Sequence, residues 1–420
     1  MPNTKKKILR GAGAALILLV AAVAALAAFV EIDGIPRYAA RPPELHVEAT
    51  PARVAHGKKL VSLLCAGCHQ GTDGVHLTGQ RIADLPPQFG EIVSKNITRH
   101  PDKGISRWTD GEIAYFLRTG VRPDGQYVPG WMIKLPHASD EDIASIVAFL
   151  RSDDPSVAPS DADPPGKTRP SFLSKALAHG VFGPLPYPEK PIVAPPRSDR
   201  VAYGRYLVFN LDCFSCHSPD FLKVDALHPE STPGYMSGGN PLGDGRGGIV
   251  PSRNLTPDPE TGIGRWSEAE FVRAVKGGFR PDGKALRYPM LPRAELDDDE
   301  AGAIWAYLRT IPAIRRDVPR PAEPVADGAG EPGKRLYESY GCAGCHGPDG
   351  AGLGGGADIR HTRDRFATDA ALRAWIEDAP SIKPGTRMPK WKGVIRDEDY
   401  DPLVRYVRAL GKQPRRTARN

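Results

Sequence analysis

The pentapeptide pattern Cys-x-x-Cys-His occurs three times in this chain and constrains its fold more than any other feature. Two thiols three positions apart can form thioethers with the vinyl groups of one porphyrin, and the next histidine then ligates the iron. The pattern therefore predicts three covalently attached haem c groups. The predicted attachment residues and iron-ligating histidines are Cys65, Cys68 and His69, then Cys213, Cys216 and His217, then Cys342, Cys345 and His346.

Two other sites use paired cysteines. A structural zinc site needs a second Cys or His pair at zinc-finger spacing, and none accompanies these motifs. A thioredoxin-like redox pair needs a βαβ setting. The three motifs use all six cysteines, which leaves none for a disulfide or a catalytic thiol.

Length and composition fit three small haem units. A chain of 420 residues is expected to form two to four domains, and three motifs divide it into units of roughly 100 residues. The net charge of +6 is mild and does not favour nucleic acid or any particular partner. The 45 glycines and 43 prolines indicate loop-rich domains joined by extended connections.

The N-terminus predicts a membrane segment. Lys5, Lys6, Lys7 and Arg10 precede an uncharged run over residues 11–30, which is long enough to cross a bilayer as a helix. The basic flank belongs on the cytoplasmic side, which places the haem domains on the periplasmic side of the bacterial cytoplasmic membrane. A cleaved signal peptide ending at Ala25-Leu26-Ala27 is the alternative, but the apolar run is longer than is usual for one.

Composition and motifs predict a linear order of domains. We expect a membrane anchor or signal peptide over 1–30, a tether over 31–50 that lifts the first domain off the membrane, and a first domain over 51–152. A Pro-rich linker over 153–198, containing a short helix near 172–182 that bridges domains, leads to a second domain over 199–312. A linker over 313–330, a third domain over 331–411 and a basic tail over 412–420 complete the chain. The tail is either a solvated end or a contact for anionic lipid or an acidic partner.

The first two domains are predicted to be an internal duplication. Residues 96–151 repeat as 254–309 without a gap, at an offset of 158, and the second domain has ten extra residues between motif and repeat. Capping boxes begin a helix at Thr109 with Glu112 and at Ser267 with Glu270, and Ser139 caps another helix. Each domain is expected to open with a helix into its haem motif and to close with an amphipathic helix, so the predicted fold is all-α.

Each iron needs a second axial ligand or an open position. Three of the five methionines, Met132, Met290 and Met388, lie one per domain between the haem motif and the closing helix. We predict that these thioethers ligate the irons, which raises the reduction potential relative to two imidazoles. Other candidates are Met236 in the second-domain insert and the unrepeated histidines His76, His100, His137, His228 and His361.

The chain resembles class I cytochrome c in all three domains. The run Asn254-Leu255-Thr256-Pro257-Asp258, followed by Thr261-Gly262-Ile263-Gly264 and Trp266, is similar to the triheme cytochrome c subunits of bacterial membrane-bound alcohol and gluconate dehydrogenases. The first domain departs from this run at Arg99, His100 and Lys103, and the third shares only general cytochrome c features. The resemblance implies that electrons pass from a quinoprotein or flavoprotein subunit to ubiquinone.

Two classes of function follow. The first is an electron-transfer subunit without substrate chemistry of its own, whose partners are a dehydrogenase and either quinone or a terminal oxidase. The second is an enzyme such as a haem peroxidase, which needs an iron with an open site. One methionine per domain favours the first class. A donor to a terminal oxidase or another respiratory complex, without a dedicated dehydrogenase, is the alternative within it.

Overall fold

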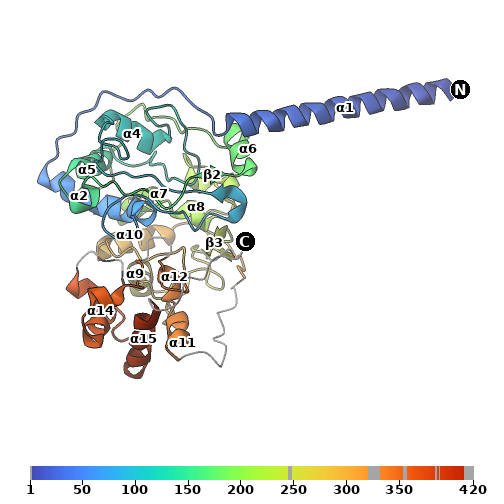
Figure 1. The fold of residues 1–420 in the computed structure, drawn as a ribbon. Coiled ribbons are helices and arrows are strands. Elements are labelled where there is room, and N and C mark those ends of the chain that lie inside the picture. The colour runs from blue at the N-terminus through green and yellow to red at the C-terminus, as the bar shows by residue number, and fades with distance from the viewer. Residues whose placement is uncertain are drawn as a thin grey trace.

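The computed structural model describes residues 2–244, 248–319, 332–352, 357–383, 386 and 388–410, with side chains from residue 11 onward except that of residue 339. Helices form most of its regular structure (Figure 1). They are α1 (Pro2–Asp33), α2 (Pro51–Leu64), α3 (Ala66–His69), α4 (Asp110–Thr119), α5 (Asp140–Arg151), α6 (Phe172–Gly180), α7 (Arg200–Asn210), α8 (Cys213–His217), α9 (Glu268–Gly277), α10 (Asp298–Leu308), α11 (Pro332–Ser339), α12 (Ala343–His346), α13 (Thr362–Arg365), α14 (Asp369–Ile382) and α15 (Asp397–Ala409). The predicted basic tail over 412–420 and most of the second linker lie outside the described residues.

Short strands and 3-10 turns accompany the helices, so the fold is helix-rich and not purely helical as predicted. In the described ranges β1 (Gly90–Glu91) pairs with β2 (Arg169–Pro170), and β3 (Pro241–Gly243) pairs with β4 (Ile249–Pro251), both antiparallel. The 3-10 turns are η1 (Pro87–Phe89), η2 (Pro155–Val157), η3 (Phe221–Lys223) and η4 (Pro229–Ser231). Strands of two or three residues rich in Gly and Pro carry no alternating pattern, which is why the sequence did not predict them.

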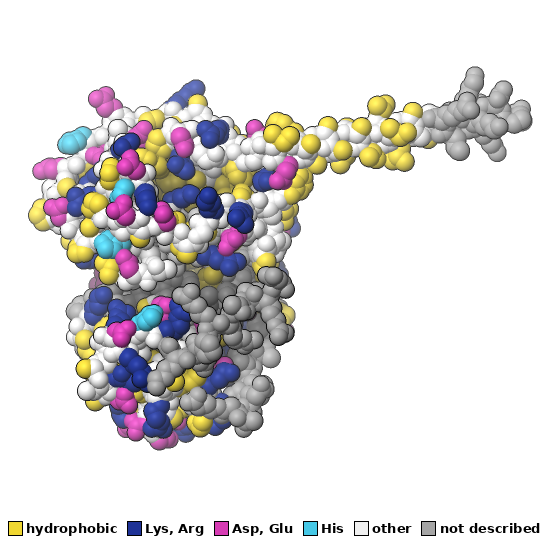
Figure 2. Space-filling view, viewed as in Figure 1, with side chains coloured by type: hydrophobic (Ala, Val, Ile, Leu, Met, Phe, Trp, Pro, Cys, Tyr) yellow, Lys and Arg dark blue, Asp and Glu magenta, His cyan; other side chains and the backbone are white. Residues whose placement is uncertain are grey.

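Helix α1 projects away from the rest of the molecule (Figure 1), and from residue 11 onward its surface carries apolar side chains (Figure 2). Residues Gly11–Asp33 are long and apolar enough to cross a membrane, and only 6% of this segment's most apolar stretch is buried by protein. The following segment is not a free tether. The Tyr38 amide donates to Gly125 O at 2.8 Å, and the Val47 amide donates to Asp110 Oδ2 at 3.0 Å. The folded body therefore begins close to the end of α1.

Within the part of the chain that the structure describes, three hydrophobic cores organise the body, and a pair of helices packs in each. The first core lies between α2 and α5, the second between α7 and α10, and the third between α11 and α15. A glycine stands at each of these helix contacts. A Cβ on Gly57, Gly204 or Gly333 would lie 1.8 Å from Ser145 O, 1.9 Å from Ala303 O or 2.2 Å from Pro402 O. Only a residue without a side chain allows the two backbones of each pair to approach this closely.

Helix boundaries follow the predicted caps. Both predicted capping boxes form, from Thr109 with Glu112 at α4 and from Ser267 with Glu270 at α9. The Ser139 hydroxyl accepts from the Asp142 amide and begins α5. These side chains satisfy amide groups that have no partner within the first helical turn.

The two segments related by the 158-residue offset also share local geometry. The Thr98 amide donates to Asn96 Oδ1 at 2.8 Å, and the Thr256 amide donates to Asn254 Oδ1 at 2.9 Å. The Leu135 amide donates to Leu117 O at 2.8 Å, and the Arg293 amide donates to Val275 O at 2.7 Å. Corresponding residues thus form corresponding hydrogen bonds.

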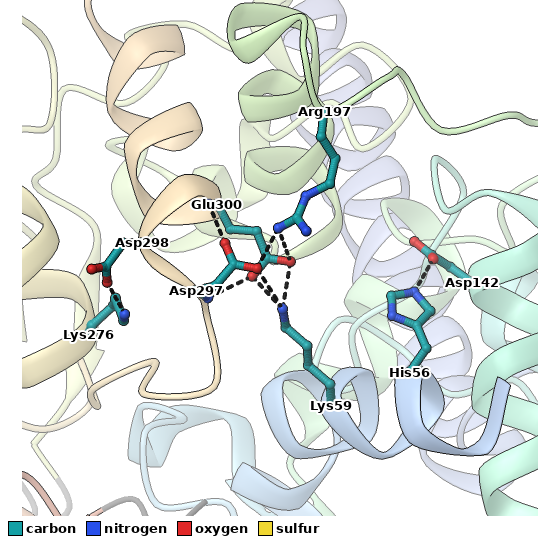
Figure 3. Close-up of polar contacts among 8 residues, drawn as sticks. All are labelled: His56, Lys59, Asp142, Arg197, Lys276, Asp297, Asp298 and Glu300. Atoms are coloured by element: carbon teal, nitrogen blue, oxygen red, sulfur yellow. Dashed lines mark hydrogen bonds and ion pairs between the residues drawn. The ribbon is translucent and has the colours of Figure 1, made fainter. Parts of the chain in front are cut away.

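A cluster of charged residues joins the first two cores (Figure 3). Lys59 of α2 donates to both carboxylate oxygens of Glu300 of α10 at 2.6 Å, and Arg197 lies 3.4 Å from the same carboxylate. The Glu300 side chain is only 6% exposed. Nearby, the Ser62 hydroxyl donates to Glu295 Oε1 at 2.6 Å. A buried carboxylate requires such cationic partners, so these contacts fix α2 against α10.

A loop of the second unit reaches into the third core. Phe279 belongs to the third core, where its ring meets that of Trp391 edge to face at a centroid distance of 4.8 Å. At the far end of the same loop, Arg293 Nη1 donates to Leu63 O of α2 at 3.4 Å. The loop over 279–295 therefore contacts all three units, and it carries the predicted ligand Met290.

Candidate haem sites

Each Cys-x-x-Cys-His motif forms a short helix, α3, α8 or α12, that follows the opening helix of its unit. The helix begins at or directly after the first cysteine and ends at the histidine. All six cysteines are half-buried. Burial raises the pKa of Cys213 and of Cys342 to about 12, so these thiols stay neutral. The structure thus presents three thiol pairs, each followed by a histidine.

The three motif histidines share one hydrogen bond. Their Nδ1 atoms lie 2.7 Å from Lys95 O for His69, 2.7 Å from Arg253 O for His217 and 2.8 Å from Ala357 O for His346. A carbonyl oxygen only accepts, so Nδ1 carries the proton in every case. The lone pair of Nε2 is then left for a metal, which is the usual arrangement of an imidazole ligand.

Burial also favours the neutral imidazole. It lowers the pKa of His69, His217 and His346, and the hydrogen bond to the carbonyl opposes this shift in each case. A neutral imidazole is the form that binds iron. The three histidines therefore combine the required tautomer with the required protonation state.

A large cavity lies over the third motif. It has a volume of about 1430 Å³ and is lined by Cys342, Cys345, His346 and Met388 together with Tyr337 and Trp391. This is larger than a typical small-molecule site of ~300–1,000 Å³. The wall holds two thiols, an imidazole and a thioether among apolar side chains. These residues fit a haem attached through both cysteines.

The same cavity extends to the other units. First-unit residues Ala66, Gln80 and Ile82 line it, as do second-unit residues Phe279 and Leu286. Residues of all three units consequently line the cavity over the third motif.

The predicted methionine ligands occupy comparable places. Met132 is half-buried and packs against the first core, as Cys65 does, and Met388 packs against the third core, as Cys342 does. Met290 is half-buried, and its amide donates to Arg287 O at 2.9 Å, as the amide of Met132 donates to Pro129 O at 3.2 Å. Iron ligation by these residues stays a prediction.

Met236 has a different environment. Its side chain is fully buried in the second core, and its carbonyl accepts from the Leu255 amide at 2.8 Å. In the first unit Leu77 is buried in the same way and accepts from the Ile97 amide at 2.9 Å. Met236 thus takes the place of a core leucine.

The alternative histidines are each held by another group. A carboxylate lies 2.6 Å from His76, 2.8 Å from His100, 3.3 Å from His228 and 3.7 Å from His361. His137 Nε2 lies 2.8 Å from Ala226 O. These contacts engage the side chains that were considered as alternatives to methionine.

The structure adds Tyr288, which the sequence did not single out. Its side chain is 6% exposed, and its amide nitrogen would lie 3.5 Å from a Cβ on Gly344 of the third motif. Burial raises the pKa of Tyr288 far above its usual range, and nearby Asp84, Cys68, Cys345 and Cys216 add to the shift. One cysteine from each motif therefore lies within electrostatic reach of this residue. No local pattern marks it, because the convergence arises from chain segments far apart in sequence.

Comparison with protein families matches most of the body to cytochrome c models. The model of "Cytochrome C oxidase, cbb3-type, subunit III" matches residues 52–150 and 328–407. The model of "Cytochrome c" matches residues 201–312. The three matched ranges each contain one haem motif.

Curated relatives extend the match beyond single domains. The cytochrome c subunit of a quinone-dependent alcohol dehydrogenase from Gluconobacter oxydans is 28% identical over 398 residues, covering 86% of this chain and 79% of the relative. The fructose dehydrogenase cytochrome subunit of Gluconobacter japonicus is 31% identical over 347 residues, covering 73% of this chain and 67% of the relative. The gluconate 2-dehydrogenase cytochrome c subunit of Pantoea cypripedii is 29% identical over 328 residues, covering 73% of this chain and 71% of the relative. The chain therefore belongs to the family of c-type cytochromes that includes the cytochrome c subunits of alcohol, fructose and gluconate dehydrogenases.

Proposed function

We propose that this chain is a triheme cytochrome c that relays electrons from a periplasmic dehydrogenase subunit to the membrane respiratory chain. The observation that carries the proposal is the common geometry of His69, His217 and His346, whose Nδ1 atoms are all fixed by a backbone carbonyl. A haem c bound at each site supplies one-electron chemistry. The names of the relatives supply the class of partner, a dehydrogenase that oxidises a small organic substrate.

Under this proposal each unit is a class I cytochrome c domain, with domain boundaries at 51–152, 199–312 and 331–411. The first two domains arose by duplication, which the corresponding hydrogen bonds of residues 96–151 and 254–309 support. The cysteine pairs would hold the haems, and the motif histidines together with Met132, Met290 and Met388 would ligate the irons. With both side chains bound, the irons would offer peroxide and oxygen no direct binding position.

The proposed location follows from α1. Its apolar segment Gly11–Asp33 anchors the chain in the cytoplasmic membrane, with the haem domains on the periplasmic side. This position brings the domains near quinone and membrane-bound oxidases.

A terminal oxidase is the second candidate for the acceptor. It is favoured by the match of residues 52–150 and 328–407 to the model of a cbb3-type oxidase subunit. Quinone is favoured by the relative whose name specifies a quinone-dependent alcohol dehydrogenase.

The test uses the purified full chain in detergent. On its own it should not turn over hydrogen peroxide, alcohols, aldehydes or sugar acids with a dye acceptor. It should be reduced rapidly when its cognate dehydrogenase and that enzyme's substrate are added. The reduced chain is then mixed with a short-chain ubiquinone or with a purified oxidase, and reoxidation by one of them identifies the acceptor. Turnover of any of these substrates by the isolated chain would contradict the relay.

A further inference from the structure

Helix α6 has an unusual distribution of side chains for a surface helix. At 100° per residue, the arc that faces away from the protein contains only Phe172, Leu173, Ala176, Leu177 and Gly180. Phe172 is 49% exposed and Leu173 is 41% exposed, and Val181, directly after the helix, is 56% exposed. A helix on a water-facing surface normally turns its apolar residues inward. This outward arc therefore indicates a contact with something other than water.

The polar residues of α6 face the protein instead. The Ser174 hydroxyl donates to Phe89 O at 2.7 Å, which fixes α6 against η1 of the first unit. Ser174 and Ala178 are buried on this side. The predicted helix is thus present, and it packs on η1 of the first unit and on α1. That it also bridges domains stays a prediction.

The remaining side of α6 is tied to the end of α1. Lys175 forms an ion pair with Glu31. His179 Nε2 lies 3.1 Å from Gly34 O and 3.5 Å from Asp33 Oδ2, and its ring lies 5.4 Å from that of Phe29. The two acidic residues at the end of α1 are therefore matched by groups of the protein itself.

These contacts define the level of α6 relative to a membrane. The apolar segment of α1 ends at Asp33, and α6 is attached to residues 29–34. In Figure 1 α6 lies at the point where α1 leaves the body. If α1 spans a bilayer, this point coincides with the boundary between acyl chains and headgroups, where amphipathic helices place their apolar faces.

We propose that the outward arc of α6 inserts into this boundary and, together with α1, holds the haem-bearing body at a fixed height on the bilayer. The occupant is lipid, because α6 contacts the end of the apolar helix α1 and its outward arc is uncharged. The proposal rests on the membrane anchor of the proposed function. A second attachment beside a single helix restricts rotation of the body about α1, and so restricts which haem edges face the membrane.

The test is labelling of single introduced cysteines in lipid nanodiscs that contain one chain each. In the haem-loaded protein all six native cysteines are in thioethers, so an introduced cysteine is the one reactive thiol. Phe172→Cys and Leu173→Cys probe the arc, and Leu19→Cys probes the α1 span. Val193→Cys is the matched control, because Val193 is apolar and 83% exposed and its neighbour Ile192 contacts the start of α5.

A bulky water-soluble maleimide should label Val193→Cys rapidly and the α6 and α1 variants at least ten times more slowly. All should be labelled after denaturation in detergent, and haem absorption verifies that each variant is folded. Labelling of both α6 variants at the rate of Val193→Cys, with Leu19→Cys protected, would overturn the α6 proposal and leave the anchor intact. Rapid labelling of Leu19→Cys as well would overturn both. A single chain in each disc excludes protection by a second copy or by a partner.

Discussion

The motif histidines depend on residues that lie well beyond their motifs. Lys95 and Arg253, whose carbonyls hold His69 and His217, are separated by the same 158 residues as the repeated segments. Each precedes an asparagine, Asn96 or Asn254, whose side chain accepts from the amide two residues later. The motif alone predicts a histidine ligand. The tautomer of His69 or His217 is set by the loop that carries Lys95 or Arg253. The sequence reveals this loop only as part of a repeat.

The proposal that methionines are the distal ligands is tested by replacing Met290 with alanine. Loss of the thioether should lower one midpoint potential and remove part of the weak near-infrared sulfur-to-iron band, because a thioether favours ferrous iron. Met236→Leu is the matched control and should change neither property, since Met236 occupies the place that Leu77 has in the first core. An unchanged spectrum in Met290→Ala, or a shifted potential in Met236→Leu, would refute the assignment.

A pH-dependent contribution to stability is expected from His56. Its hydrogen bond to Asp142, 2.7 Å long, raises the pKa of His56 despite partial burial. This contribution is complete below the unfolded-state pKa of about 6.5 and is lost as pH rises through the folded-state value. The His56 side chain is 42% exposed, so the effect should be only about 0.2–1 kcal/mol. The thermal unfolding temperature of His56→Gln should lie further below that of the wild type at pH 5.5 than at pH 8.5. An equal difference at both pH values would refute the contribution of His56.

At the scale of elements, close contact between opening and closing helices is the shared feature of the three units. Gly204→Ala should destabilise the second unit by about 1–3 kcal/mol, because the new methyl group would lie 1.9 Å from Ala303 O. Gly277→Ala is the control in the same unit. Its Cβ would meet nothing closer than 3.9 Å, so stability should stay equal or rise by about 0.4–1 kcal/mol. Chemical denaturation of both variants measures the free energy of unfolding. Equal changes in the two variants would show that close contact at Gly204 does not stabilise the second unit.

Regular helices that begin at a serine or threonine cap could be predicted. Thr109, Ser139 and Ser267 begin α4, α5 and α9 because serine and threonine side chains cap the first amides. Helix α14 was not predicted. Thr368 caps its start in the same way, but Pro380 and a non-helical residue at Asp378 interrupt the helix near its end. Proline interrupts the hydrogen-bond pattern on which periodicity depends.

At the scale of the whole molecule, the loop over 279–295 joins the units. Phe279→Ala should destabilise the third unit by about 3–5 kcal/mol, the usual cost of removing a buried phenylalanine. Phe279→Leu should destabilise the third unit much less, because leucine keeps most of the buried side-chain volume. Limited proteolysis followed by mass spectrometry should show earlier cleavage within residues 331–411 in the alanine variant. Equal resistance of wild type and Phe279→Ala would show that this contact does not stabilise the third unit.

The joining of the units lies beyond what local sequence patterns reveal. Phe279 corresponds to Val121 in the first segment, and both are buried, but Phe279 belongs to a core built mainly from residues after 330. The convergence of Cys68, Cys216 and Cys345 near Tyr288 likewise depends on how three units pack. The motifs predicted three haem sites and the residues of each site. How close the three sites lie to one another depends on long-range contacts, which no motif contains.

Under the proposed function, one chain carries three haems that all exchange electrons, and none of them binds an exogenous ligand. A reductive titration of the purified full chain tests this, with its haems counted by the pyridine haemochrome method and carbon monoxide added at the end. We expect three haems and three electrons per chain, and no spectral change with carbon monoxide. Fewer than three electrons, or a haem that binds carbon monoxide, would contradict it.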